Sequence, residues 1–237
     1  MNSLFTNNIS LDHGTHTYQL LDDPEFRFAS VTEFIHEFFR KFDQEKTAKK
    51  LISEHPKYIN RTLDDVIKEW RKGAERGTIV HNELELFIKK GIEPKHELAS
   101  VGARWLKTKQ ENPDNTFYSE VIVYSKELGV AGTIDVLVYN KKQDTYHLVD
   151  WKTNKRINQK PFGNKKGILN ATQHLDDCNF IHYSLQLSFY RYILENCYGL
   201  KVGSQTLFHL RADNYKTYTV NYHEGDLVNM LREKELI

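Results

Sequence analysis

The sequence predicts an α/β protein in which helices flank a small central mixed β-sheet. Apolar residues recur at helical spacing through the first half of the chain, and the spacing changes to that of strands from Phe117 onward. After residue 180 the pattern returns to a helix, then a pair of strands and a last helix. This order of elements is typical of a small mixed sheet covered by helices.

The first half of the chain is predicted to be helical after a short hairpin. The hairpin is expected within residues 14–29, around the Asp-Asp-Pro sequence at 22–24. Residues 30–33, Ser-Val-Thr-Glu, fit a capping box that opens a helix rich in phenylalanine. Gly73 and Gly77 lie four residues apart, where small side chains permit close packing against a neighbour. The other helices are expected over Ala48–Glu54, Leu63–Lys90 and Lys95–Gln110.

The second half is predicted to supply the sheet. Runs rich in β-branched and aromatic residues are separated by polar turns, which is the pattern of successive strands. These three strands are expected over Phe117–Glu127, Val130–Tyr139 and Thr145–Lys152. A long polar loop, 153–173, follows them. The remaining elements are a helix over Phe180–Tyr198, strands over Gln205–Arg211 and Lys216–Tyr222, and a helix over Asp226–Lys234.

Composition limits the class of protein. The chain has 237 residues and a formal net charge of +1, so any affinity for nucleic acid must come from local patches rather than from a global basic field. Its two cysteines are too few for a four-thiolate metal site, which favours a reducing setting. No signal peptide or membrane span is evident, so we expect an intracellular protein of a bacterium, a phage-infected cell or an organelle.

Acidic residues that end apolar runs in two predicted strands are the strongest functional signal. Asp135 follows one apolar run, and Asp150 and Lys152 close the next. Alternation along a strand puts Asp150 and Lys152 on one face, and a hairpin brings Asp135 beside them. Two carboxylates with one ammonium suit a hard divalent cation and a positive charge that handles a water or a phosphate.

A third acid, Glu120, lies inside the first predicted strand. A carboxylate in a hydrophobic run is costly to bury unless it is paired or binds a metal. Three successive strands that each carry such an acid therefore point to one shared site.

With these residues the chain resembles the PD-(D/E)XK nuclease superfamily. An acid that closes the second strand and an acid-x-lysine on the third are its pattern, which Asp135 and Asp150-x-Lys152 match. Three more matches resemble its RecB-like branch: the helical Gly-x-x-x-His motif, the additional acid and the Gln-x-x-x-Tyr motif, at Gly77–His81, Glu120 and Gln186–Tyr190. The segment from Ser30 is similar to one in the mitochondrial genome maintenance exonuclease and phage exonucleases.

The resemblance spans about residues 30–222 and implies a restriction-endonuclease-like core with helical N-terminal additions. It implies one nuclease domain over 1–237, with a hairpin and helices in 1–60 and a catalytic core in 61–222. The implied cofactor is Mg²⁺ or Mn²⁺, and a histidine ligand favours Mn²⁺. An iron–sulfur cluster is not expected. The implied ligands are His81, Asp135, Asp150, the backbone carbonyl of Trp151, and Glu120, which binds either an ion or a metal-bound water.

The implied role of Lys152 is to orient the attacking water and offset charge on the phosphoryl oxygens. Gln186 and Tyr190 are interpreted as holding the nucleic-acid backbone or the lysine; an amphipathic core helix explains them as well. Ser30 is a helix cap or a phosphate contact. The basic residues after Lys152 form either a solvated loop or a set of phosphate contacts: Lys155, Arg156, Lys160, Lys165 and Lys166.

These observations predict a metal-dependent DNA nuclease, most simply an exonuclease that acts on single-stranded DNA or on DNA ends. The exonuclease preference comes from the resemblance. A structure-specific endonuclease for DNA or RNA, with the same metal site, is one alternative. A non-catalytic nucleic-acid-binding protein on a degenerate nuclease fold is the other. Replication or recombination proteins are expected partners, and a membrane is not.

Overall fold

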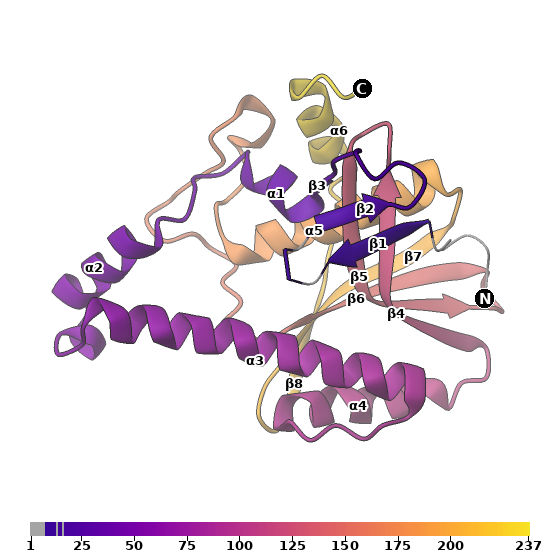
Figure 1. The fold of residues 1–237 in the computed structure, drawn as a ribbon, viewed down its shortest axis with the longest axis horizontal. Helices are drawn as coiled ribbons and strands as arrows, with labels where there is room; N and C mark the ends of the chain where they lie inside the picture. The colour runs from indigo at the N-terminus through magenta and orange to yellow at the C-terminus, as the bar shows by residue number, and fades with distance from the viewer. Residues whose placement is uncertain (1–7, 13, 16) are drawn as a thin grey trace.

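The computed structural model describes residues 8–12, 14–15 and 17–237, and it contains a mixed sheet between two layers of helices (Figure 1). Strands β4 (Asn115–Ser125), β5 (Val130–Asn140) and β6 (Thr145–Lys152) form an antiparallel meander. Strand β7 (Val202–Leu210) pairs parallel to β6, and β8 (Tyr215–Thr219) pairs antiparallel to β7. The predicted α/β class with a central mixed sheet is confirmed.

Each face of the sheet has its own helix layer and its own hydrophobic core. Helices α3 (Leu63–Lys90) and α4 (Glu97–Gln110) pack on one face, over Val136, Val149 and Trp151 among others. The other face is covered by helices α1 (Val31–His36), α5 (Asn179–Tyr192) and α6 (Glu224–Glu233). Figure 1 shows the long helix α3 running beneath the sheet, with α2 (Gln44–Glu54) beside its N-terminal part.

Helix α3 is stabilised at both ends, which explains its length. Thr62 and Asp65 form a capping box, and Gly91 ends the helix in the left-handed region at φ 67°. Its 28 residues span about 42 Å. The buried residues Val80 and Leu84 anchor its C-terminal half to the sheet. The helix therefore holds residue 81 rigidly against the strands.

The ladder between β4 and β5 is interrupted at the two acids. Ser119 pairs with Val136 and Val121 pairs with Ile134, but the residues between them do not pair. Glu120 has φ 51°, a left-handed conformation that costs about 1–2 kcal/mol for a residue with a Cβ. On a regular strand Ile134 and Val136 would point to the same face of the sheet. Here Val136 packs toward α3 and α4 whereas Ile134 packs toward α5, so the side chains of β5 exchange faces at this point.

The N-terminal prediction needs correction. The hairpin consists of β1 (Ile9–Asp12) and β2 (Thr17–Leu20), so it precedes the Asp-Asp-Pro sequence, and residue 16 of the predicted span lies outside the described residues. Residues 22–24 instead begin the connection to β3 (Ala29–Ser30), a short strand parallel to the start of β5. Alternating polar and apolar residues occur on both sides of this turn, so the pattern could not choose between them.

Some predicted boundaries are confirmed and others differ: α2 begins at Gln44, behind the cap residue Asp43, and not at the predicted Ala48. Leu63–Lys90 and the strand Thr145–Lys152 have the predicted bounds. Helix α1 ends at His36, and α5 ends at Tyr192 in a π-helical turn over Ile193–Cys197. Three-residue helical turns occur over Pro56–Tyr58 and Asn170–Thr172. The capping box at Ser30 and Glu33 is confirmed.

Two glycines differ sharply in their surroundings. A Cβ at Gly73 would meet nothing within 4 Å, so the prediction of close packing at this position is wrong. A Cβ at Gly132, on β5, would lie 2.4 Å from Cε1 of Tyr190. Tyr190 is 3% exposed, so its ring has no room to move aside. A glycine at 132 therefore allows α5 to pack directly on the strand that carries Asp135.

These surroundings predict opposite effects for two matched substitutions. Gly132→Ala should destabilise the protein by about 1–3 kcal/mol because the new methyl overpacks against the Tyr190 ring. Gly73→Ala should stabilise it by about 1 kcal/mol because alanine is the better helix former. Denaturant unfolding of both variants measures the two changes. A Gly132→Ala protein as stable as wild type would contradict the packing described here.

Candidate metal centre

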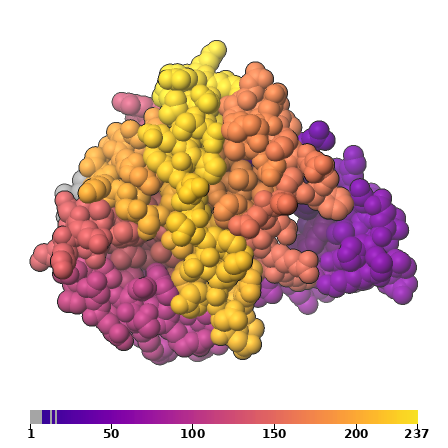
Figure 2. All heavy atoms as spheres, turned by 180° about the vertical axis from the view of Figure 1, so that it is seen from behind, coloured from indigo at the N-terminus to yellow at the C-terminus, as the bar shows by residue number. Residues whose placement is uncertain are grey.

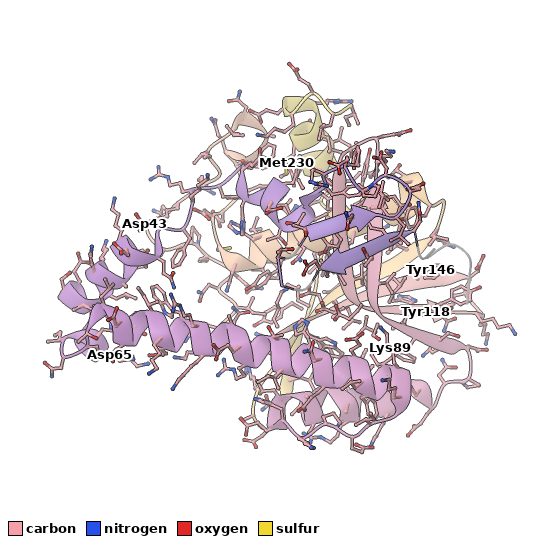
Figure 3. All side chains as sticks on the ribbon, in the orientation of Figure 1. Asp43, Asp65, Lys89, Tyr118, Tyr146 and Met230 are labelled. Carbon is pink, nitrogen blue, oxygen red and sulfur yellow. The ribbon has the colours of Figure 1, made fainter. Side chains whose placement is uncertain are left out.

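Four elements that are distant in sequence bring their polar residues together at one point. His81 comes from α3, Glu120 from β4, Asp135 from β5, and the segment 150–152 from the end of β6. In Figure 3, the labelled Lys89 on α3 and Tyr118 on β4 mark the region where the helix crosses the strand. The group lies where the sheet changes face, so it is open to residues of both helix layers.

Three of these side chains form a group that can bind a metal ion. One ligand atom each from His81, Glu120 and Asp135 lies within 4.8 Å of the others. Nδ1 of His81 is 3.4 Å from Oδ1 of Asp135. One imidazole nitrogen and two carboxylates are a donor set for a divalent cation, and the nitrogen favours transition metals such as Mn²⁺ over Mg²⁺.

The backbone of Trp151 contacts two members of this group. Its N–H donates to Oδ2 of Asp135 at 2.7 Å, and its carbonyl oxygen lies 3.1 Å from Nε2 of His81. The Trp151 side chain is 2% exposed and packs among the residues beneath α3 and α4, so this peptide group is fixed in place. The carbonyl that was predicted as a ligand thus faces the predicted histidine ligand.

Asp150 and Lys152 form a separate pair beside the group. Nζ of Lys152 lies 2.7 Å from Oδ2 of Asp150, and Asp150 is 3% exposed. Both residues alternate with Trp151 and face the α5 side of the sheet. Asp150 is not a member of the three-residue group, so its role as a ligand remains a prediction.

Burial and crowding of charge perturb every carboxylate here. Burial, with the neighbouring charge of Asp135, raises the pKa of Glu120 to about 8. Burial also raises the pKa of Asp150, to about 6, against the opposing effect of Lys152. For Asp135, burial is outweighed by His81, Lys152 and the Trp151 N–H, and the pKa is lowered. A cluster of three acids with divergent pKa values is typical of a functional site.

The histidine occupies a position that suits either a proton or a cation. Burial lowers its pKa, but Asp135 outweighs this and raises the pKa of His81 to about 9. Both ring nitrogens face oxygen atoms, from Asp135 and Trp151, which accept hydrogen bonds from an imidazolium. The same oxygens, together with a neutral ring nitrogen, are suitable metal ligands. The residues therefore fit the divalent cation that the sequence predicts.

The family assignment agrees with this geometry. The sequence model of the PD-(D/E)XK nuclease superfamily matches residues 15–235. The chain belongs to this superfamily. Membership implies a metal-dependent nuclease, a hydrolase that acts on nucleic acid, and superfamily members use divalent metals.

Other comparisons add little to this assignment. No curated protein sequence matches the chain. The crystal structure of SSO0001 resembles the nuclease with a TM-score of 0.41 and 13% sequence identity, over 88% of this chain and 74% of that one. Among the described residues, no helix is long and apolar enough to cross a membrane.

The residues predicted to contact nucleic acid differ in their burial and in their hydrogen-bond partners. Nε2 of Gln186 donates to the hydroxyl of Tyr190 at 2.8 Å and approaches Oγ1 of Thr32 at 3.4 Å. Tyr190 is buried against Gly132, so it can act on a substrate only through Gln186. Ser30 caps α1 by accepting from the Glu33 N–H at 3.1 Å. Capping alone accounts for the side chain of Ser30.

The basic loop after Lys152 is partly tied to the rest of the nuclease. Lys155 pairs with Glu69 of α3, which also pairs with Arg61. Lys166 pairs with Asp176 at 2.6 Å. Arg156 is exposed, and its backbone carbonyl accepts from the Asn179 side chain at 3.1 Å. Phosphate contacts by this loop remain a prediction.

Three residues near the site were not found by sequence analysis. Arg76 donates to the backbone carbonyl of Thr153 at 3.2 Å, directly after the predicted catalytic lysine. Tyr18, from the N-terminal hairpin, lies 3.0 Å from Oγ1 of Thr133 on the strand that carries Asp135. Tyr183 lies beneath Lys152. For Tyr183 a signal existed, because it shares one face of a helix with Gln186 and Tyr190.

The raised pKa of Glu120 predicts a pH-dependent gain in stability for Glu120→Gln. The folded protein holds this proton up to about pH 8, whereas a free glutamate loses it near 4.5, so wild-type stability falls as the pH rises through this range. Glutamine removes that loss. With EDTA present, the melting temperature of Glu120→Gln should exceed that of wild type, by more at pH 8 than at pH 5. Glu25→Gln, at an exposed position, is the control and should show no such trend.

Proposed function

We propose that this nuclease is a RecB-like DNA exonuclease that acts on single-stranded DNA or DNA ends, with Mg²⁺ or Mn²⁺ as its cofactor. The observation that carries the proposal is the approach of His81, on α3, to Asp135 and to the carbonyl of Trp151. The helical histidine of the Gly-x-x-x-His motif distinguishes the RecB-like pattern from a plain acid-x-lysine pattern. Its place beside both predicted ligands supports the RecB-like assignment.

Each polar residue has a distinct role in this proposal. His81, Asp135 and the Trp151 carbonyl hold the cation, with Glu120 and Asp150 completing its surroundings. The bound cation supplies a water of lowered pKa and a Lewis acid for the scissile phosphate. Lys152 orients that water and offsets the negative charge that develops on the phosphoryl oxygens. Asp150 holds Lys152 in place through their 2.7 Å contact.

Preference for a single strand is supported by exposed aromatic side chains near the loop that leaves the site. Phe42 is 69% exposed and Phe162 is 80% exposed, far more than is usual for such residues. The Phe42 ring contacts that of Trp70 on α3, with centroids 5.6 Å apart. Lys50 of α2 lies 5.7 Å from the Phe162 ring centroid. Bases of a single strand stack on aromatic rings of this kind without regard to sequence.

Preference for a free end is supported by the shape of this region. Figure 2 shows the molecule hollowed between the orange segment that follows β6 and the indigo segment containing α2. Two contacts join the loop that follows β6 to these helices: Lys155 with Glu69 of α3, and Phe162 with Lys50 of α2. A strand that passes through an enclosed space must enter by an end. A circular strand has none.

The proposal predicts a pattern of cleavage across matched DNA substrates. With Mn²⁺ or Mg²⁺, the wild-type protein should degrade linear single strands and leave circular single strands intact, and EDTA should stop the reaction. Lys152→Ala and Asp135→Asn should each lower the cleavage rate at least about 100-fold because they remove the ammonium and a metal ligand. Labelled oligonucleotides resolved on gels measure these rates.

Lys142→Ala is the control for these variants, since Lys142 is an exposed lysine in the turn between β5 and β6, at the opposite end of β6 from Lys152. It should cleave at the wild-type rate. Cleavage of circles by the wild-type protein would replace the exonuclease proposal with an endonuclease. Full activity of Lys152→Ala would mean that the assigned site is wrong.

The aromatic residues predict a separate effect on binding. Phe162→Ala should weaken the binding of a single-stranded oligonucleotide about tenfold, because stacking on one ring contributes about 1–3 kcal/mol per base. Fluorescence anisotropy in Ca²⁺ measures the dissociation constant without cleavage. Leu21→Ala, which removes another exposed apolar side chain (62% exposed), is the control and should bind normally. Equal affinities for all three proteins would exclude stacking on Phe162.

A further inference from the structure

The ammonium group of Lys152 rests on the face of an aromatic ring. Its Nζ lies 4.3 Å from the ring centroid of Tyr183, which comes from α5. We propose that Tyr183 is a positioning residue for Lys152, which it holds by a cation–π contact in the place that phosphodiester cleavage requires. This inference rests on the proposed function, because it deepens the role given there to Lys152.

The contact is sheltered, which makes it strong. The Lys152 side chain is 15% exposed, and the ring of Tyr183 is half-buried against the core beneath α5. A cation over an aromatic face gains little when both are in water and considerably more when they are shielded from it. The ammonium therefore has two partners, the ring on one side and Oδ2 of Asp150 at 2.7 Å on another.

The Tyr183 ring holds the Lys152 ammonium without using its hydrogen-bond donors, which a second carboxylate would do. A lysine ammonium has three N–H donors, and each carboxylate that binds it takes at least one of them. A π-face attracts the charge without accepting a conventional hydrogen bond, so donors remain for a water or a phosphate oxygen. With Asp150 as its single partner, the long flexible side chain of Lys152 could adopt several conformations around that one contact. The ring limits this freedom while it leaves the reactive side of the ammonium open.

The ring is itself fixed from its far end. Its hydroxyl donates to Oδ1 of Asn154 at 3.0 Å, and the backbone carbonyl of Asn154 lies 2.6 Å from Nε2 of His209. His209 is 2% exposed and occupies the position on β7 that pairs with Lys152. The contacts thus form a closed path from Lys152 through Tyr183, Asn154 and His209 back to the neighbouring strand.

The loop residues Arg156 and Asn158 are hydrogen-bonded to α5, the helix that carries Tyr183. The Asn179 side chain, one turn before Tyr183, accepts from the N–H of Asn158 at 2.8 Å and donates to the carbonyl of Arg156 at 3.1 Å. The chain that leaves Lys152 is therefore held against the first turns of α5. This arrangement keeps the ring in register with the ammonium, because helix, loop and lysine cannot shift separately.

Two substitutions at one position separate the ring from the hydroxyl. Tyr183→Leu removes the π-face and should lower kcat for single-stranded DNA about 10- to 30-fold, the equivalent of a sheltered cation–π contact. KM and the affinity for Mn²⁺ should stay within about twofold, since Tyr183 touches neither DNA nor metal in this scheme. Tyr183→Phe keeps the face, so it should recover most of the kcat that leucine loses.

Phe26→Leu is the matched control for a merely structural effect. Lys126, in the turn between β4 and β5, lies over the Phe26 ring at 5.2 Å, so this variant removes a similar contact in a part of the fold that contains none of the site residues. It should keep the wild-type kcat at a comparable loss of melting temperature. A wild-type kcat for Tyr183→Leu would overturn the proposal. So would an equal loss for Tyr183→Phe, which would assign the effect to the hydroxyl, or a loss that appears in KM or Mn²⁺ affinity instead.

A second measurement tests the contact without any cleavage. In protein labelled with ¹³C at the lysine ε-carbon, the ring should shift the Lys152 resonance upfield, and its absence from Lys152→Ala assigns it. The shift should persist in Tyr183→Phe and disappear in Tyr183→Leu; an unshifted wild-type resonance would overturn the contact. If the wild-type protein cleaves no nucleic acid, the proposed function fails, and this spectrum still decides whether the ring holds the lysine.

Discussion

The peptide group of Trp151 is the contact on which the site depends. Its N–H binds the carboxylate of Asp135 and its carbonyl faces His81, so one rigid unit connects β5, β6 and α3. The unit is rigid because the indole is buried under α3 and α4, where it meets the rings of Trp105 and Phe208 edge-on. Packing on one face of the sheet thereby sets the position of polar atoms at its end.

The change of face at Glu120 explains how one site draws on two helix layers. A regular strand would send Glu120 and Asp135 wholly to one side of the sheet. The left-handed conformation of Glu120 interrupts the ladder, and the acids lie between the layer of His81 and the layer of Tyr183. This conformation costs energy, and so does the burial that raises the pKa of Glu120 to about 8. Both costs are concentrated at the candidate site, as expected when function rather than stability selects a residue.

Sequence patterns predicted α3 and the strand meander well. Thr62, Asp65 and Gly91 fix the ends of α3, and a change of period marks the meander. They failed where several turns were compatible with the same alternation, as in the N-terminal hairpin, and at the end of α1 and the start of α2, where the apolar spacing does not coincide with the helix. The acids and the lysine were predicted because alternation along a strand places residues two apart on the same face. Arg76 and Tyr18 were not, because their significance lies in contacts across the fold. Tyr183 was missed although it shares a helix face with Gln186 and Tyr190.

The sequence by itself determined the α/β class and the order of the main elements, and it predicted most of the polar residues that the candidate site brings together. Local periodicity and capping act over a few residues, so they can be read directly from the chain. Only the tertiary structure decided that Glu120 joins His81 and Asp135, whereas Asp150 pairs with Lys152 over the ring of Tyr183. The reason is that the directions of these side chains depend on three features of the fold: the left-handed backbone at Glu120, the close packing of Tyr190 on Gly132, and the buried peptide group of Trp151. The spacing of residues along the chain does not specify such directions.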